Sequence, residues 1–339
     1  MSFDQLLRAA VDRPLTVDEA DDAFAVVMEG QASPVQVAAL LTAIRARGVA
    51  SDEIAGGVRV LRRAMVPVPT PWADSVVDTC GTGGGSFTTF NISTAAGLLA
   101  SGLGVRVAKH GNRSFTSRCG SADVLEALGV AFDLSPARQA ELIDETGIVF
   151  MFAPHHHPAM RHVGPVRREL GFFTIMNLLG PLTNPAGARR QVVGVVDPAL
   201  LSLIADALVT LEHIHTLVVH GLPGLDELSP IGPTRILEVR NGSIRSLEFD
   251  PARELGWKEL DPSGLAGGDP AENAATITGV LRGEIGGAAK AAVVLNAAAA
   301  LYVADVVGDL REGVDLATRG IDEGAGWTQL ERLREASSL

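Results

Sequence analysis

Residues 78–94 combine the residue types that bind an anion. A short apolar run, Ser75-Val76-Val77, predicts a buried strand that ends at Asp78. Four glycines follow closely, at Gly81, Gly83, Gly84 and Gly85. Glycine lets backbone N–H groups approach an anion without a Cβ in the way. Asn91 or Ser93 then caps a predicted helix, whose first N–H groups and dipole also attract negative charge. The pattern indicates a phosphate-binding loop.

This loop matches neither of the two commonest phosphate-binding motifs. The P-loop has a Lys followed by Ser or Thr after its last glycine, whereas this chain reads Gly85-Ser86-Phe87. The dinucleotide-binding fingerprint has a glycine where Ser86 stands. A plain strand–turn–helix connection would also use glycines, so the loop alone leaves both interpretations open.

Lys109 favours phosphate binding. The chain has only three lysines, Lys109, Lys258 and Lys290, and otherwise uses arginine for its cations. Residues 105–108 predict a second strand, which would deliver Lys109 directly at its end. A lysine retained there indicates a point charge for a phosphate, and Arg113 and Arg118 add two cations nearby.

Three segments together resemble the anthranilate phosphoribosyltransferase family. They read GTGGGSFTTFNIST from Gly81, KHGNRS from Lys109 and GSADVLEALG from Gly120. The resemblance extends over essentially the whole chain. It implies transfer of the phosphoribosyl group of 5-phosphoribosyl 1-diphosphate (PRPP) to the amine of anthranilate, with release of pyrophosphate, as a step of tryptophan biosynthesis.

The resemblance also implies a set of site residues. For PRPP these are Gly81, Gly84, Gly85, Thr89, Asn91, Ile92, Ser93, Thr94, Lys109, His110, Gly111, Asn112, Arg113, Ser114, Phe115, Thr116, Ser117 and Ser121. Gly81, Asn112 and Arg167 are expected to bind anthranilate. Ser93, Asp226 and Glu227 are expected to hold Mg²⁺, with two ions. No catalytic acid or base is assigned, because an arylamine hardly needs one.

Without the resemblance, some of these assignments stay open. Arg167 and Arg168 are adjacent, and either could bind a carboxylate in bidentate fashion; a solvated helix face with a local ion pair is the alternative. Asp226 and Glu227 suit Mg²⁺, which takes a few hard oxygens, but an isolated Asp-Glu is more often an ordinary acidic loop.

The triple histidine at 155–157 invites a metal site. Consecutive side chains point in divergent directions, and His162 is the nearest further candidate ligand. A turn followed by a helix that begins at Pro158 is the favoured interpretation.

Two positions depart from the family pattern. Gly85 stands where the family usually has Asp, and Phe173 stands where it usually has Arg. Loss of a negative charge at Gly85 leads us to expect weaker inhibition by excess Mg²⁺, with neutral drift as an equally weighted alternative.

The elements that position these residues fall into two regions. Residues 1–65 show four short amphipathic helices, and the Pro-rich stretch 66–71 reads as a linker. Strand and helix patterns then alternate, which predicts an α/β fold with a mostly parallel central sheet covered by helices. Residues 235–248 predict an antiparallel hairpin that turns at Asn241-Gly242, and residues 270–339 predict terminal helices.

We therefore predict two domains. The small α-helical domain spans 1–70, and the large α/β domain, which carries the phosphate site, spans 71–157 and 185–339. That residues about 158–184 complete the small domain is implied by the resemblance.

Composition narrows the functional classes. A net charge of −12 argues against a nucleic-acid surface. The apolar run 288–307 is interrupted by Lys290, Asn296 and Asp305, so it predicts a buried helix and not a membrane span. No signal peptide is evident, and two cysteines without C-x-x-C spacing favour a reduced, cytoplasmic protein. The resemblance implies a homodimer formed through the helical domain.

Three alternatives remain. A pyrimidine nucleoside phosphorylase-like enzyme would share the fold, but its glycine loop usually carries Lys-His-Ser ahead of Thr-Gly-Gly, unlike Asp78-Thr79-Cys80. A phosphoribosyltransferase with a different aromatic acceptor is the second. A non-catalytic nucleic-acid-binding relative is the third, and the acidic net charge opposes it.

Overall fold

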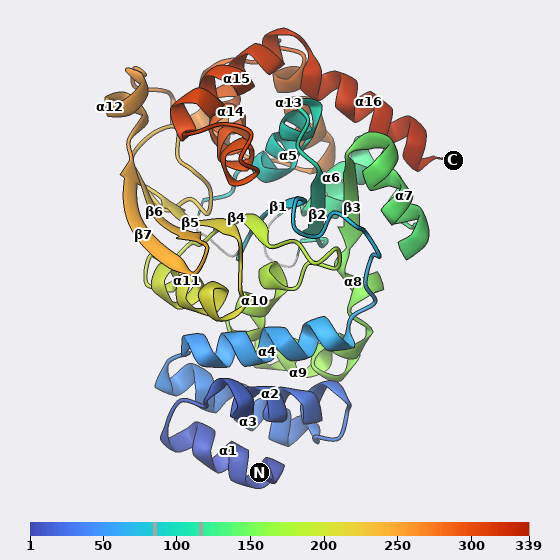
Figure 1. Cartoon of the computed structure of the whole chain (residues 1–339), viewed down its shortest axis with the longest axis vertical. Coiled ribbons are helices and arrows are strands. Elements are labelled where there is room, and N and C mark those ends of the chain that lie inside the picture. Colours follow the sequence, from blue (N-terminus) through green and yellow to red (C-terminus); the bar gives the residue numbers. More distant parts are fainter. Residues whose placement is uncertain (84–86, 115–117, 339) are drawn as a thin grey trace.

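The structure, a computed structural model, describes residues 1–83, 87–114 and 118–338 (Figure 1). The amino-terminal helices form one end of the molecule and a sheet with its covering helices forms the other. The first four helices are α1 (Phe3–Asp12), α2 (Val17–Met28), α3 (Pro34–Arg47) and α4 (Ser51–Ala64).

Local sequence explains where the first helices begin. Ser2, Thr16 and Ser33 cap α1, α2 and α3, and each accepts a hydrogen bond from the backbone N–H three residues later. Each helix buries an apolar face against the others, including Leu6 of α1 and Phe24 of α2. Four amphipathic helices are thus confirmed in this region.

The sheet has seven strands in the order β3-β2-β1-β4-β5-β6-β7. Their bounds are β1 (Val77–Gly81), β2 (Val107–Gly111), β3 (Ile148–Phe152), β4 (Arg190–Gly194), β5 (His215–Gly221), β6 (Thr234–Arg240) and β7 (Ser243–Phe249). The first five strands pair in parallel, and β6 and β7 add an antiparallel edge. Asn241 and Gly242, both at positive φ, make the predicted hairpin turn.

Both faces of the sheet are covered. Helices α5 (Ile92–Gly102) and α14 (Gly287–Val303) pack on one face, and α11 (Leu200–Thr210) packs on the other, next to α4. Consecutive residues alternate between these layers: Val192 belongs to the apolar core with α5 and α14, whereas Val193 belongs to the core with α4 and α11. The α/β class with a mostly parallel sheet is therefore confirmed.

The remaining helices complete the cover. They are α6 (Ser121–Ala127), α7 (Pro136–Thr146), α12 (Pro251–Leu255), η3 (Pro262–Leu265), α13 (Pro270–Leu281), α15 (Leu310–Asp322) and α16 (Ala325–Ser337). Helix α14 is buried along almost its whole length. None of the described helices combines the length and the apolar character that crossing a bilayer requires.

A mostly helical segment between β3 and β4 returns to the amino-terminal helices. It comprises α8 (Ala153–His156), η1 (Pro158–His162), α9 (Gly164–Leu170), α10 (Met176–Leu179) and η2 (Gly180–Leu182). Helix α9 contacts α3 and α10 contacts α4, and Val163 and Leu179 share the apolar core of these helices. The same core continues into α11 and one face of the sheet, so it has no break at residue 70 or 184.

Two strand boundaries differ from the predictions. β1 continues three residues past Asp78 to Gly81, and β2 begins at Val107 and includes Lys109. The cause is pairing: β1 runs alongside β4 as far as Gly81–Gly194, and β2 runs alongside β3 as far as Gly111–Phe152. Lys109 and His110 are therefore held by the sheet and do not lie in the loop after it.

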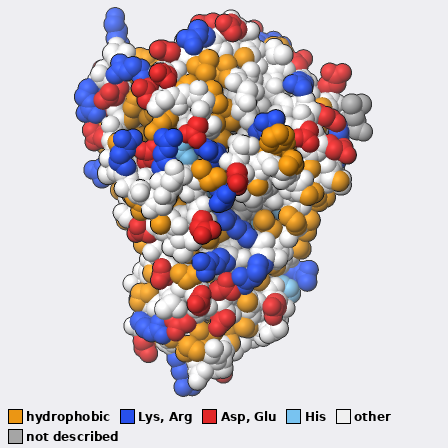
Figure 2. Space-filling model, viewed as in Figure 1, with side chains coloured by type: hydrophobic (Ala, Val, Ile, Leu, Met, Phe, Trp, Pro, Cys, Tyr) orange, Lys and Arg blue, Asp and Glu red, His pale blue; other side chains and the backbone are white. Residues whose placement is uncertain are grey.

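Charged side chains of both signs are interspersed over the face that Figure 2 shows. Several Lys and Arg side chains gather on this face where the helical end meets the rest of the molecule. Cations that gather locally can attract an anionic ligand even though the chain as a whole carries a net charge of −12.

Candidate active site

The predicted site residues gather at one edge of the sheet. β1 lies between β2 and β4, so the strand order reverses direction at β1. In open parallel sheets, ligands bind at such a reversal, beyond the carboxyl ends of the strands. The glycine loop follows β1, the loop from Asn112 follows β2, and Asp226 and Glu227 follow β5 at that same edge.

Lys109 places a buried positive charge at this edge. Its side chain is 4% exposed, and its Nζ donates to the carbonyl oxygen of Thr79 at 2.5 Å and to Ser93 Oγ at 3.2 Å. Within the described part of the chain, no carboxylate lies within ion-pair distance of this ammonium. Its hydrogen-bond partners are neutral oxygens, and its charge also lowers the pKa of the nearby Asp78 and Glu227 carboxyl groups, against the larger opposite effect of burial. A buried ammonium in this position can bind an anionic ligand.

Asp226 and Glu227, in the loop after β5, lie against the glycine loop and the start of α5. Asp226 Oδ2 accepts a hydrogen bond from the Gly83 N–H at 3.3 Å, and Glu227 Oε1 accepts one from the Ser93 N–H at 3.1 Å. The two acidic residues therefore contact the loop after β1 and the first turn of α5.

Two glycines permit this close approach. A Cβ at Gly81 would lie 2.7 Å from Asp226 Oδ2, and a Cβ at Gly194 would overlap the carbonyl group of Asp226. A side chain at Gly194 would push the backbone of the acidic loop away from the sheet, and one at Gly81 would displace the Asp226 carboxylate. Gly194 was not among the predicted site residues, because its role depends on a partner far away in the sequence.

The acidic pair has the properties of a cation site. Burial raises the pKa of Asp226, and burial together with the neighbouring Asp226 charge raises the pKa of Glu227. Two carboxylates that destabilise each other are stabilised by a shared cation. Their oxygens and the Ser93 hydroxyl fit Mg²⁺, which takes hard oxygen ligands and completes its shell with water or phosphate oxygens.

The triple histidine does not form a metal-ligand cluster. Over residues 1–83, 87–114 and 118–338, no three His, Cys, Asp or Glu side chains are arranged to hold a metal ion. His157 Nε2 instead lies 3.2 Å from His110 Nε2, and His156 Nδ1 lies 2.8 Å from the carbonyl oxygen of Val66. Burial lowers the pKa of His110, and lowers that of His157 to about 4, so the His110–His157 pair is neutral near pH 7.

Arg167 and Arg168 lie on α9 in different environments. Arg167 is half-buried, and burial lowers its pKa, whereas Arg168 is exposed. Arg167 has no hydrogen-bond or ion-pair partner among the side chains that the structure describes. A half-buried guanidinium without a carboxylate favours Arg167 over Arg168 as the ligand-binding cation.

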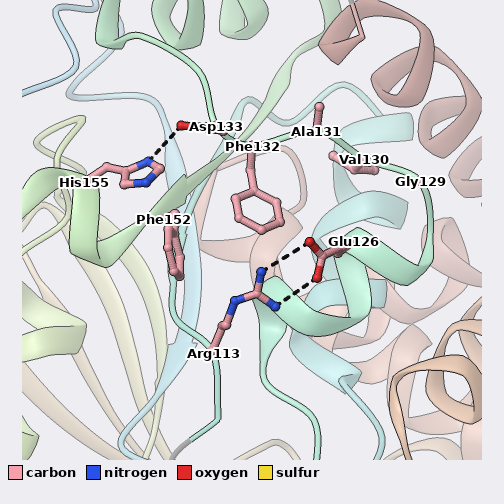
Figure 3. Close-up of a pocket in the computed structure, with 9 residues that line it drawn as sticks. All are labelled: Arg113, Glu126, Gly129, Val130, Ala131, Phe132, Asp133, Phe152 and His155. Carbon is pink, nitrogen blue, oxygen red and sulfur yellow. Dashed lines mark hydrogen bonds and ion pairs between the residues drawn. The ribbon is translucent and has the colours of Figure 1, made fainter.

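Arg113, one of the residues predicted to bind PRPP, is paired with two carboxylates. Its Nη1 donates to Asp123 Oδ1 at 2.7 Å and to Glu126 Oε2 at 2.9 Å, and its Nη2 donates to Glu126 Oε1. The guanidinium points toward α6, beside a cavity of about 510 Å³ that Phe132 and Phe152 line (Figure 3). Asp123 and Glu126, three residues apart on one helix face, are the signal that sequence reasoning did not use.

Several other predicted residues have structural partners. Asn91 is the N-cap of α5, but its side chain hydrogen-bonds Asn273 and the Cys119 carbonyl instead of capping the helix. Thr89 forms a backbone bridge with Ala266, and Ser121 donates to the Asn112 carbonyl. Ile92 and Thr94 are buried in the first turn of α5. Gly84, Gly85, Phe115, Thr116 and Ser117 lie outside the described residues.

Comparisons with known proteins agree with this arrangement. Residues 4–65 match the family described as "Glycosyl transferase family, helical bundle domain", and residues 73–327 match "Glycosyl transferase family, a/b domain". The anthranilate phosphoribosyltransferase of Rubrobacter xylanophilus is 51% identical over 99% of this chain and 98% of that protein. The chain belongs to the anthranilate phosphoribosyltransferase family.

Solved structures of this family have the same fold. The enzyme from Thermus thermophilus superimposes with a TM-score of 0.92 at 43% identity, covering 98% of this chain and 99% of that one. The Saccharomyces cerevisiae anthranilate phosphoribosyltransferase, solved in complex with PRPP and Mg, has a TM-score of 0.89 at 27% identity and covers 99% and 98% of the two chains.

Proposed function

We propose that this chain transfers the phosphoribosyl group of PRPP to the amine of anthranilate, giving N-(5-phosphoribosyl)anthranilate and pyrophosphate. One observation carries the proposal: the buried ammonium of Lys109 donates to Ser93 Oγ, and Glu227, next to Asp226, accepts a hydrogen bond from the N–H of the same Ser93. A diphosphate with a divalent cation satisfies both features, because it supplies negative charge to the lysine and a cation to the carboxylates.

We propose that Ser93, Asp226 and Glu227 hold Mg²⁺, with two ions at the site. When bound, Mg²⁺ neutralises the charge that develops on the departing pyrophosphate. Lys109 adds a fixed positive charge on the same side, and the positive end of the α5 dipole lies beside Ser93. In this proposal the predicted PRPP residues of the glycine loop, and those from His110 to Ser121, surround the diphosphate.

The acceptor is positioned from the other side. In this proposal Arg167 binds the anthranilate carboxylate, and Asn112 and Gly81 orient the ring and its amine. The neutral His110–His157 pair borders the acceptor without adding charge. Displacement at the anomeric carbon depends on alignment of the amine and stabilisation of the leaving group, so no side chain is assigned as a base.

A homodimer formed through the helical domain, residues 1–70 with about 158–184, and a cytoplasmic location belong to the same proposal. Val11 on α1 and Val35 on α3 are 62% and 78% exposed, so both are accessible to a partner at the surface of that domain. Light scattering of the wild type and of a Val35→Asp variant would test the assembly, and a monomeric wild type would contradict it.

The enzymatic test follows the fluorescence of anthranilate after PRPP and Mg²⁺ are added. We expect loss of fluorescence with stoichiometric release of pyrophosphate, abolished by a chelator. Phosphorolysis of uridine or thymidine, with no reaction of anthranilate, would support the nucleoside phosphorylase alternative instead.

A different aromatic acceptor is the second candidate, and one observation favours testing it. Phe172 and Phe173 follow α9. Phe172 is 45% exposed, and its neighbour Phe173 stands where the family usually has Arg. Assays with a panel of substituted anthranilates and other arylamines at saturating PRPP would decide. Anthranilate should give the highest kcat/KM, and a different leading acceptor would overturn the assignment.

A further inference from the structure

Asp78 is a fully buried carboxylate at the centre of the sheet, directly below the site. It lies in β1 and is 0% exposed. Its Oδ1 accepts from the His110 N–H at 3.2 Å, and its Oδ2 accepts from Asn184 Nδ2 at 2.8 Å and from Gln191 Nε2 at 3.4 Å. Burying a carboxylate is costly unless its oxygens accept hydrogen bonds, and here three donors from other segments offset part of that cost. Burial outweighs them and raises the pKa of Asp78 to about 6.

The three donors come from three segments that border the site. His110 is in β2, Gln191 is in β4, and Asn184 is in the turn after η2. Asn184 also donates to the Ala108 carbonyl at 2.7 Å and accepts from the Ala186 N–H at 2.9 Å. The carboxylate thus connects β2 and β4 with the turn that joins the helical segment to the sheet.

The hydrogen bonds that hold the phosphate side of the site do not include Asp78, although the Lys109 charge lies close enough to act on the pKa of the Asp78 carboxyl group. Lys109 is held by the Thr79 carbonyl and by Ser93, and Asp226 and Glu227 are held by Gly83 and Ser93. The contacts of Asp78 lead to His110, which contacts His157, and through His110 to Asn112, two residues later. Both His110 and Asn112 are also predicted to bind PRPP, but PRPP has many other predicted contacts, whereas Asn112 is one of only three residues predicted to bind anthranilate.

We infer that Asp78 is a positioning residue for the acceptor: it fixes the His110–Asn112 segment relative to the Asn184 turn, so that the amine and the anomeric carbon are aligned. This inference rests on the proposed function. It predicts that loss of the Asp78 charge weakens anthranilate binding much more than PRPP binding.

The decisive variant is Asp78→Asn, which keeps the shape but places an NH₂ group among three donors. We expect the KM for anthranilate to rise about 10-fold or more and kcat to fall, the scale of losing hydrogen bonds to a charged group. The KM for PRPP should stay the same or decrease, because a negative charge near the diphosphate has been removed. General loosening of the fold would weaken the binding of both substrates.

Glu53→Gln is the matched control. Glu53 is also a fully buried carboxylate, and it accepts hydrogen bonds from Leu15, Ala50 and Arg47 in the helical region, away from the site. The Glu53→Gln variant should lower Tm and leave the KM values for anthranilate and PRPP unchanged. Asn184→Ala, which keeps Asp78 and removes one donor, is expected to raise the anthranilate KM selectively and decides the question should Asp78→Asn not fold.

The outcomes separate this inference from the proposed function. A wild-type chain that does not consume anthranilate would overturn both. An active wild type whose Asp78→Asn and Asn184→Ala variants change the two KM values in parallel, or change neither, would overturn the role of Asp78 alone.

Discussion

Arg167 carries the most specific prediction at the scale of single residues. Replacing it with alanine removes the only half-buried cation of the 167–168 pair, so anthranilate binding should weaken by about 1.5–3 kcal/mol. Arg168→Ala is the control and should have a much smaller effect, because its side chain is exposed. Titration of each variant with anthranilate in the presence of PRPP measures its loss of anthranilate affinity. Equal losses in the two variants would mean that Arg167 has no special role.

The acidic pair gives a second prediction at this scale. The double variant Asp226→Asn, Glu227→Gln should abolish turnover at any Mg²⁺ concentration. Its Tm should be unchanged or higher, since burial and mutual repulsion already raise the pKa of both carboxyl groups and the neutral amides relieve that cost.

Asp322→Asn with Glu323→Gln is the matched control, an adjacent Asp-Glu pair at the exposed end of α15. It should retain full activity. Wild-type turnover by the Asp226–Glu227 double variant in Mg²⁺ would show that the metal site lies elsewhere.

Residue types could be predicted from the sequence better than residue partners. Lys109 stands out because the chain has so few lysines, and the structure places it buried beside Ser93. The engagement of Arg113 by Asp123 and Glu126 could not be predicted from a loop motif, because it depends on how the loop after β2 lies against α6. The same holds for Asp78, which reads as the last residue of a strand until its three donors are brought together.

At the scale of elements, α6 competes with the ligand for Arg113. If Arg113 binds the phosphates as predicted, its ion pairs with Asp123 and Glu126 must open first. Glu126→Gln should therefore lower the KM for PRPP by about 2- to 5-fold, the scale of an exposed ion pair.

Glu141→Gln on α7 serves as the control, because Glu141 forms a similar exposed pair with Arg138. It should leave the KM for PRPP unchanged. If Glu126→Gln raised this KM instead, the pairing with α6 would be the arrangement that Arg113 needs during binding.

Element types could largely be predicted from periodicity, whereas their ends and order could not. The hairpin of β6 and β7 follows from Asn241-Gly242 between two alternating runs. The extension of β1 and β2 past their predicted ends follows from pairing with β4 and β3, which are distant in sequence. The position of β1 at the reversal of strand order, which creates the site, has no local signal.

At the scale of the whole molecule, buried histidines make stability depend on pH. Burial lowers the pKa of His110, His156, His157, His213 and His215 in the folded chain. In the unfolded chain they take up protons near pH 6.5. Their contribution to stability is therefore complete above about pH 6.5 and is lost as the pH falls. The raised pKa values of Asp78, Asp226 and Glu227 act in the opposite direction, but the five histidines outnumber these three carboxyl groups, so the free energy of unfolding should decline between about pH 6.5 and 5.

One variant isolates this effect. His213→Asn removes one buried histidine that contacts Arg62 and Thr216, and it should reduce the slope of unfolding free energy against pH by up to about 1.4 kcal/mol per pH unit. Denaturant unfolding at several pH values gives the slopes, and the same slope in His213→Asn as in wild type would contradict the assignment.

The core shared by α1–α4 has a consequence for how the chain folds during synthesis. Val163, Leu179 and Leu182 belong to this core, as do Val193 and Val218 of the sheet. A ribosome that has released only the first four helices has therefore produced helices whose apolar faces lack part of their cover. These helices must wait for roughly another 150 residues, on the order of ten seconds of translation, before Val218 can join their core. Over that interval their exposed apolar faces are the part of the nascent chain on which a chaperone is expected to act.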